Sequence, residues 1–192
     1  MKDFLLFIIF FFFIFILNKI KSNRLILVEP NTNIKFMVIN DENKHKATEI
    51  LTKLVTDMYD IKNHLINNIH KYEDHKEYIN LLKENFTETR TSIYENDPTS
   101  DLTSFSVNKG EELAFCLKSK KTNEYHDHNL LMYVALHEMA HMACPEIGHG
   151  ELFKKVFRFI TIEAIKKGLY KKVDYNEKPV EYCGMVLSST IV

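Results

Sequence analysis

The chain has 192 residues, 45% of them hydrophobic and 12% aromatic, which is enough for one sizeable core and favours a single domain. Its formal net charge is −1, and no stretch concentrates Lys and Arg beyond pairs, so direct nucleic-acid binding is not expected. The cysteines, Cys116, Cys144 and Cys183, lack the Cys-x-x-Cys spacing of a zinc ribbon. We interpret them as buried free thiols of a reducing compartment, with a Cys144–Cys183 bridge left open.

Residues 1–24 combine an apolar segment with a basic flank. Positions 4–17 hold only Phe, Leu and Ile, and three basic residues follow: Lys19, Lys21 and Arg24. The run is shorter than the ~20 residues of a usual span, but Ile20 extends it if the lysines snorkel. No small residues mark a signal cleavage site after it. We therefore predict an uncleaved single-pass membrane anchor, with residues 25–192 on the cytoplasmic side by the positive-inside rule.

The first elements after the anchor are predicted to be two strands and two helices. Residues 25–29 and 34–39 are predicted to form short strands of a small ribbon. Between residues 44 and 69, apolar side chains recur at three- and four-residue spacing, which predicts an amphipathic helix that covers one side of the core. A shorter helix is predicted at 76–86.

An antiparallel hairpin is predicted between residues 105 and 117. Apolar and polar residues alternate at its two ends, and Asn108-Lys109-Gly110 supplies turn chemistry between them. Two longer helices follow the hairpin, at about 130–143 and 151–167.

The first of these helices carries the residues with the clearest chemistry. It is apolar apart from His137, Glu138 and His141. Residues four apart lie on one face of a helix, so both imidazoles can reach one ion at ~2.0–2.1 Å. Glu138 lies beside them, where a carboxylate can accept a proton from a metal-activated water.

A catalytic zinc usually takes a third protein ligand. His149 lies eight residues beyond His141, which on a continuous helix would be about 12 Å along the axis and too far to share an ion. The helix must therefore end between them. Pro145, Gly148 and Gly150 favour such a break.

His149 is therefore our preferred third ligand, just before the second helix, and one zinc ion per chain is expected. Glu146 and Glu181 remain the alternatives, because carboxylates also complete zinc sites.

The segment HEMAHMACPEIGHGELF, residues 137–153, resembles the zinc metallopeptidases of the WLM and SprT-like group of HExxH zincins, including relatives from large DNA viruses. The resemblance implies a minimal zincin fold in which His137, His141 and His149 bind zinc and Glu138 is the base. It also implies that Phe153 packs behind the third ligand and that the substrate is a polypeptide. The viral relatives further imply that the anchor lies in a host-cell or virion membrane.

The fold class predicted is α+β, with a small antiparallel sheet, the HExxH helix and flanking helices behind the anchor. The predicted function is zinc-dependent hydrolysis of peptide bonds with Glu138 as general base. The alternative is a membrane-anchored structural or interaction protein, such as a virion component, with a non-catalytic zinc site. A third possibility is a metal site that cuts RNA, against which the near-neutral charge and Glu138 argue.

Overall fold

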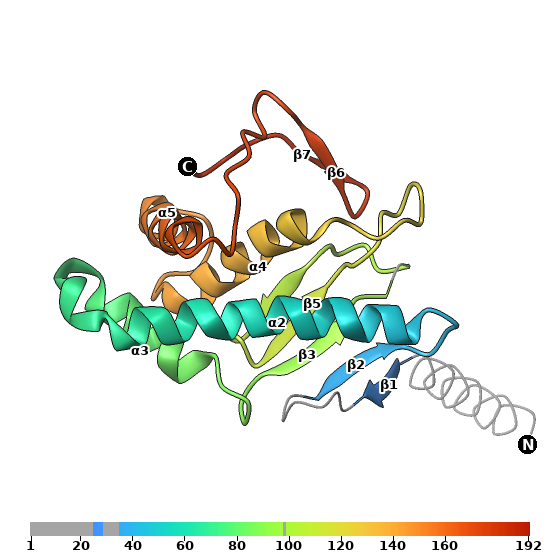
Figure 1. The fold of residues 1–192 in the computed structure, drawn as a ribbon, viewed down its shortest axis with the longest axis horizontal. Coiled ribbons are helices and arrows are strands. Elements are labelled where there is room, and N and C mark those ends of the chain that lie inside the picture. Colours follow the sequence, from blue (N-terminus) through green and yellow to red (C-terminus); the bar gives the residue numbers. More distant parts are fainter. Residues whose placement is uncertain (1–24, 29–34, 98) are drawn as a thin grey trace, which may run out of the picture.

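The structure is a computed structural model that describes residues 25–28, 35–97 and 99–192 (Figure 1). The predicted anchor, residues 1–24, lies outside the described residues, and so does the turn between the first two predicted strands. Within the described part of the chain, no helix is both long and apolar enough to cross a membrane.

Five strands form one mixed sheet in the order β1-β2-β3-β5-β4. They are β1 (Leu25–Val28), β2 (Phe36–Ile39), β3 (Ser92–Glu95), β4 (Phe105–Val107) and β5 (Glu112–Phe115). The predicted pairs β1–β2 and β4–β5 are confirmed as antiparallel. The prediction of an antiparallel sheet is otherwise wrong, because the unpredicted strand β3 runs parallel to both β2 and β5. A long helical connection separates β2 from β3, and such a crossover gives parallel pairing.

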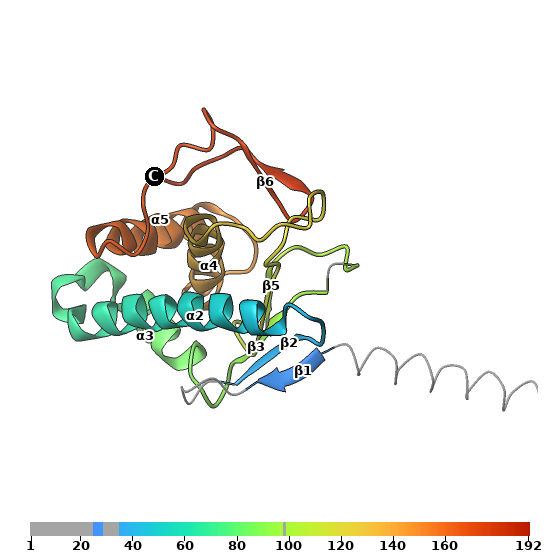
Figure 2. The same ribbon diagram turned by 45° about the vertical axis from the view of Figure 1, so that its right-hand side comes forward.

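The four predicted helices are confirmed in place and approximate length. They are α2 (Lys44–Asn67), α3 (Lys76–Asn85), α4 (His128–Ala143) and α5 (Glu151–Lys166), with two short 3₁₀ turns, η1 (Ile69–Lys71) and η2 (Glu73–His75), between α2 and α3. Helix α2 contacts β2 and helix α4 contacts β4, so the helices gather on one face of the sheet (Figures 1 and 2). The domain is therefore α+β.

Helix α4 is the centre of the core. It packs against α2, α3 and α5 as well as β4, and 12 of its 16 residues are buried. A helix that is apolar almost all round needs such cover on every side. The polar side chains that α4 carries in its second half, His137, Glu138 and His141, therefore lie in largely apolar surroundings.

The C-terminal region adds a second, two-stranded sheet that the sequence analysis did not predict. Its strands are β6 (Val180–Tyr182) and β7 (Met185–Leu187), and they pair antiparallel. The turn between them places both Cys183 and Gly184 in the left-handed region, at φ 51° and 90°. This β6–β7 hairpin lies apart from the five-stranded sheet, beyond helix α4 (Figure 1).

The cysteine prediction is wrong for two of the three residues. Cys116, just after β5, and Cys183, in the β6–β7 turn, form a disulfide across 67 positions of sequence, whereas Cys144 is a buried free thiol. The fold brings together residues that no local spacing connects. Disulfides persist in oxidising compartments, so the bridge argues against the cytoplasmic placement, which stays a prediction.

Removal of the bridge is expected to destabilise the domain. Cys116→Ser combined with Cys183→Ser should lower the free energy of unfolding by about 2–4 kcal/mol, because the unfolded chain regains the entropy that the cross-link removes. Urea unfolding of the oxidised protein measures this change, with Cys144→Ser as the variant that leaves the bridge intact. Mass spectrometry of the non-reduced protein should find the Cys116 and Cys183 peptides linked, and three free thiols would contradict the assignment.

Candidate metal centre

Helix α4 begins and ends through specific local chemistry. The side chain of Asp127 caps its N-terminus by accepting a hydrogen bond from the amide of Leu130, at 3.0 Å. At the other end Cys144 adopts an extended conformation, with φ −86° and ψ 129°, directly before Pro145. The chain then turns back through a loop, residues 144–150, which ends at the start of α5.

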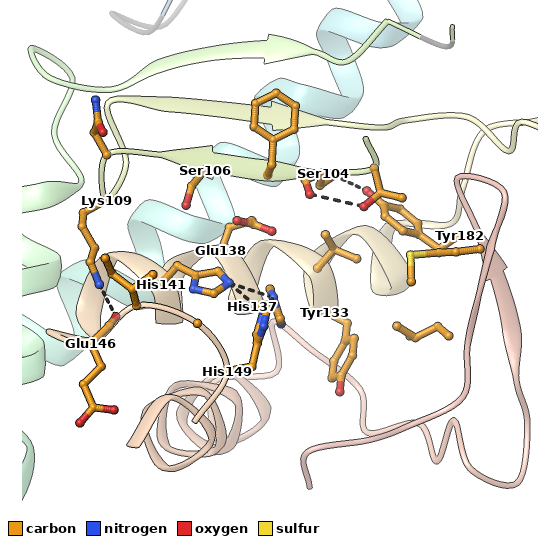
Figure 3. A pocket seen from close by; sticks show the side chains of 18 residues that line it. Ser104, Ser106, Lys109, Tyr133, His137, Glu138, His141, Glu146, His149 and Tyr182 are labelled. Carbon is orange, nitrogen blue, oxygen red and sulfur yellow. Dashed lines mark hydrogen bonds between the residues drawn. The ribbon is translucent and has the colours of Figure 1, made fainter. Parts of the chain in front are cut away.

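This loop brings His149 to the two histidines of α4. The Nε2 atoms of His137, His141 and His149 lie 3.1 Å from one another in all three pairs. Figure 3 shows the three rings converging on one point. Among the described residues, neither Glu146 nor Glu181 joins this group. The Glu146 side chain points away from it in Figure 3, while Glu181 accepts a hydrogen bond from the amide of Gly184.

The three imidazole nitrogens lie too close together for all of them to direct lone pairs at one point with no metal ion or hydrogen atom between them. Lone pairs that face each other repel unless a metal ion or a proton lies between them. Protonation is disfavoured here, since burial and the neighbouring histidines lower the pKa of His137 to about 3. Burial, then His149 and Lys109, lowers the pKa of His141 to about 4. Neutral imidazoles are the form that binds metals, so the three histidines could bind a metal ion.

The phenyl ring of Phe153 supports the cluster from behind. Its centroid lies 4.8 Å from that of His149, 4.4 Å from that of His141 and 5.0 Å from that of His137. The position that the family resemblance implied for Phe153 is confirmed. A rigid aromatic contact of this kind limits the rotation of all three imidazoles.

Glu138 lies next to the histidines but is more deeply buried, with 4% of its surface exposed. Burial raises the pKa of its carboxyl group to about 7, against the opposing effect of a hydrogen bond from the Ser106 hydroxyl on β4. The carboxyl group and the histidines line the same cavity, of about 670 Å³. A carboxyl group tuned to neutral pH beside a metal-binding cluster is suited to proton transfer.

Lys109 is a residue of this site that the sequence did not reveal. It lies in the β4–β5 turn, where Asn108, Lys109 and Gly110 all have positive φ, at 47°, 58° and 101°. Its ammonium group donates to the backbone carbonyl oxygens of Cys144 and Glu146. The side chain thus holds the loop that carries His149. The turn was predicted, but no local signal connects it to a loop 35 residues further along.

Comparisons with known proteins decide the family. No family model matches the chain. Protein R325 of Acanthamoeba polyphaga mimivirus, described as uncharacterized, is 40% identical over 178 residues, which cover 93% of this chain and 89% of that protein. The chain belongs to the R325 family.

Two further viral proteins match a shorter part of this R325-family chain. Protein 136R of Invertebrate iridescent virus 6 is 41% identical over 69 residues, 35% of this chain and 38% of that protein. Protein 042R of Invertebrate iridescent virus 3 is 36% identical over 70 residues, 36% of this chain and 43% of that protein. Both are described as uncharacterized.

Among solved structures, Wss1 from Saccharomyces cerevisiae matches with a TM-score of 0.46 and 17% identity, covering 68% of this chain and 89% of that chain. A Wss1 mutant from S. pombe matches with a TM-score of 0.46 and 21% identity, covering 66% and 92%.

Glu138→Gln is expected to stabilise the metal-free protein more at pH 8 than at pH 5. In the folded chain the pKa of the Glu138 carboxyl group is raised from 4.5 to about 7, so the folded chain holds this proton more tightly than the unfolded chain. The protonated carboxyl group therefore contributes to the free energy of unfolding at low pH, and this contribution is lost as the pH rises through 7. Glutamine does not ionise, so the variant does not lose this stability at high pH. The gain should be about 2–3 kcal/mol larger at pH 8.

Urea unfolding in the presence of a chelator at both pH values measures the difference. Glu49→Gln is the control, since 72% of the Glu49 side chain is exposed. Equal gains for Glu138→Gln at pH 5 and pH 8 would show that Glu138 ionises normally.

Proposed function

We propose that the chain is a zinc-dependent peptidase with His137, His141 and His149 as metal ligands and Glu138 as general base. The observation that carries the proposal is the convergence of three Nε2 atoms, 3.1 Å apart, beside a buried carboxyl group on one cavity.

The spacing of the nitrogens fits zinc. Three atoms 3.1 Å apart share a central point about 1.8 Å from each, close to the ~2.0–2.1 Å of a zinc–histidine bond, so His137, His141 and His149 would hold a zinc ion with little rearrangement. Structural zinc sites are usually closed by four protein ligands, whereas catalytic sites keep one position open. Three ligands at the wall of a 670 Å³ cavity favour the catalytic type.

The chemistry divides between the metal and Glu138. When bound, zinc would act as a Lewis acid on the scissile carbonyl and lower the pKa of a water molecule. Glu138 takes a proton from the attacking water as the new C–O bond forms. It then delivers that proton to the leaving nitrogen as the C–N bond breaks. The Ser106 hydroxyl orients the Glu138 carboxylate during both transfers.

The substrate in this proposal is an extended polypeptide. Among the strands that the structure describes, β4 is the last of its sheet and pairs only with β5. Residues 103–106 line the cavity, so the free edge of β4 borders the metal centre. An extended chain can add to such an edge through main-chain hydrogen bonds. Membrane attachment through residues 1–24 belongs to the proposal and rests on the sequence alone.

Zinc content is the first measurement. Elemental mass spectrometry of the purified full-length chain should find about one zinc per molecule. His149→Ala should weaken zinc binding by more than the ~10–100-fold that is typical when a residue hydrogen-bonded to a metal ligand is removed. His70→Ala, an exposed histidine on η1, should leave the affinity unchanged. A folded parent chain without zinc affinity would end the peptidase proposal.

The role of Glu138 separates a peptidase from a protein that keeps zinc for stability alone. Glu138→Gln should retain zinc but cleave unfolded casein about 10²–10⁴-fold more slowly than the parent, because the proton acceptor is lost. Glu49→Gln should cleave at the parental rate. Cleavage by Glu138→Gln at the parental rate would favour the structural alternative.

A further inference from the structure

The cavity at the metal centre has two unlike ends. Apart from the histidines and Glu138, its charged lining residues are Lys109 and Glu146, which both lie on one side of the histidine cluster (Figure 3). Tyr133 and Tyr182 lie on the other side (Figure 3). We call this second part of the cavity the apolar end.

The apolar end is built from helix α4 and the β6–β7 hairpin. Its lining residues are Tyr133, Val134, Tyr182, Met185 and Leu187. Tyr133 and Val134 lie one turn before His137, so this surface begins directly beside the metal centre. Met185 and Leu187 are two apart on a strand and share one face, whereas Val186 points to the other. Val186 is accordingly absent from the cavity wall.

The polar atoms of the two tyrosines are already paired. The Tyr182 hydroxyl bonds to the Ser104 hydroxyl, which also accepts a hydrogen bond from the amide of Cys116. The Tyr133 hydroxyl accepts a hydrogen bond from the amide of Ile191, at 3.1 Å. The rings therefore face the cavity as apolar walls. A charged group placed there would lose hydration without gaining a partner.

Met185 is the adaptable part of this surface. It is 48% exposed, although methionine is usually buried, and it lines the cavity at its rim. An unbranched thioether can adjust to aliphatic and aromatic groups of different shape. Tyr133 and Tyr182, at 5% and 2% exposure, form the fixed part of the same wall.

The direction of β4 relates the apolar end to one side of the scissile bond. The chain passes from Ser104, bonded to Tyr182, through β4 to Lys109, bonded to the Glu146 carbonyl. A polypeptide that pairs antiparallel with β4 therefore runs from the Lys109 end to the Tyr182 end. Antiparallel pairing is the more stable arrangement. Residues on the C-terminal side of the cut would lie at the apolar end.

We propose that the apolar end is a specificity pocket that takes a large aliphatic or aromatic side chain from the substrate residue directly after the scissile bond. This inference rests on the proposed peptidase function and adds the class of substrate. Burial of such a side chain discriminates by roughly tenfold or more against a charged residue at the same position.

Sequencing of the new N-termini formed in unfolded casein by the full-length, zinc-loaded chain tests the proposal. Leu, Ile, Met and Phe should begin these termini about tenfold more often than Asp and Glu, relative to their frequencies in casein. Met185→Asp and Leu187→Asp should each abolish the preference. Val186→Asp places the same charge on the same strand, facing away from the cavity, and should retain it.

A flat distribution of new N-termini, or enrichment only at the residue before the cut, would overturn the pocket and leave the peptidase function standing. Loss of the preference in Val186→Asp to the same degree as in Met185→Asp would overturn it as well. Met185 is half exposed, so its variant remains informative if Leu187→Asp does not fold.

A binding experiment distinguishes a failure of this inference from a failure of the proposed function. The zinc-loaded Glu138→Gln chain should bind the peptide Leu-Ala-Ala about tenfold more tightly than Asp-Ala-Ala, and Met185→Asp should remove the difference. If casein is not cut at all, the peptidase proposal fails, and the binding result still decides the pocket. Equal binding of the two peptides would overturn it.

Discussion

The end of helix α4 at Ala143 is the constraint on which the candidate metal centre depends. His149 can meet His137 and His141 only if the chain leaves the helix and returns within eight residues. A helix end exposes carbonyl groups that need partners. Here the Asn85 side chain donates to the carbonyl of Met142, at 2.8 Å, and the Lys109 ammonium donates to those of Cys144 and Glu146. Side chains from two distant segments therefore hold the helix end and the loop.

The β4–β5 turn consequently ends strand β4 and also contacts the loop that carries His149. Gly110 makes this possible, because a Cβ atom there would overlap the sulfur of Met142 and lie 3.1 Å from the Asn85 carbonyl. Its φ of 101° also belongs to the region that glycine tolerates. The close approach brings the Lys109 ammonium within reach of the loop. The free edge of β4 and the position of His149 are thus set by one packed turn.

Local patterns predicted the parts of the structure that depend on local chemistry. The helices follow from apolar periodicity, and the histidine cluster follows from a four-residue spacing and a break at Pro145. Strand β3 was missed because it is only four residues long, Ser-Ile-Tyr-Glu, and two strand-favouring residues are too few to identify a strand, whereas its place between β2 and β5 comes from tertiary pairing. The Cys116–Cys183 bridge was missed for the same reason, because only the folded chain brings the two residues together.

The disulfide connects the compartment of the protein to the shape of the cavity. Cys183 directly follows Tyr182, and Cys116 directly follows β5, so the bridge fixes the β6–β7 hairpin to the same sheet that carries the β4 edge. Without the bridge, the described contacts near this turn include the hydrogen bond between the Tyr182 and Ser104 hydroxyls, the bond from the Cys183 amide to His126, and the packing of the Tyr182 ring on His126. The metal ligands belong to α4 and its loop and do not depend on the hairpin. An oxidising compartment would therefore fix the apolar wall, whereas a reducing one would loosen that wall and leave the histidine cluster intact.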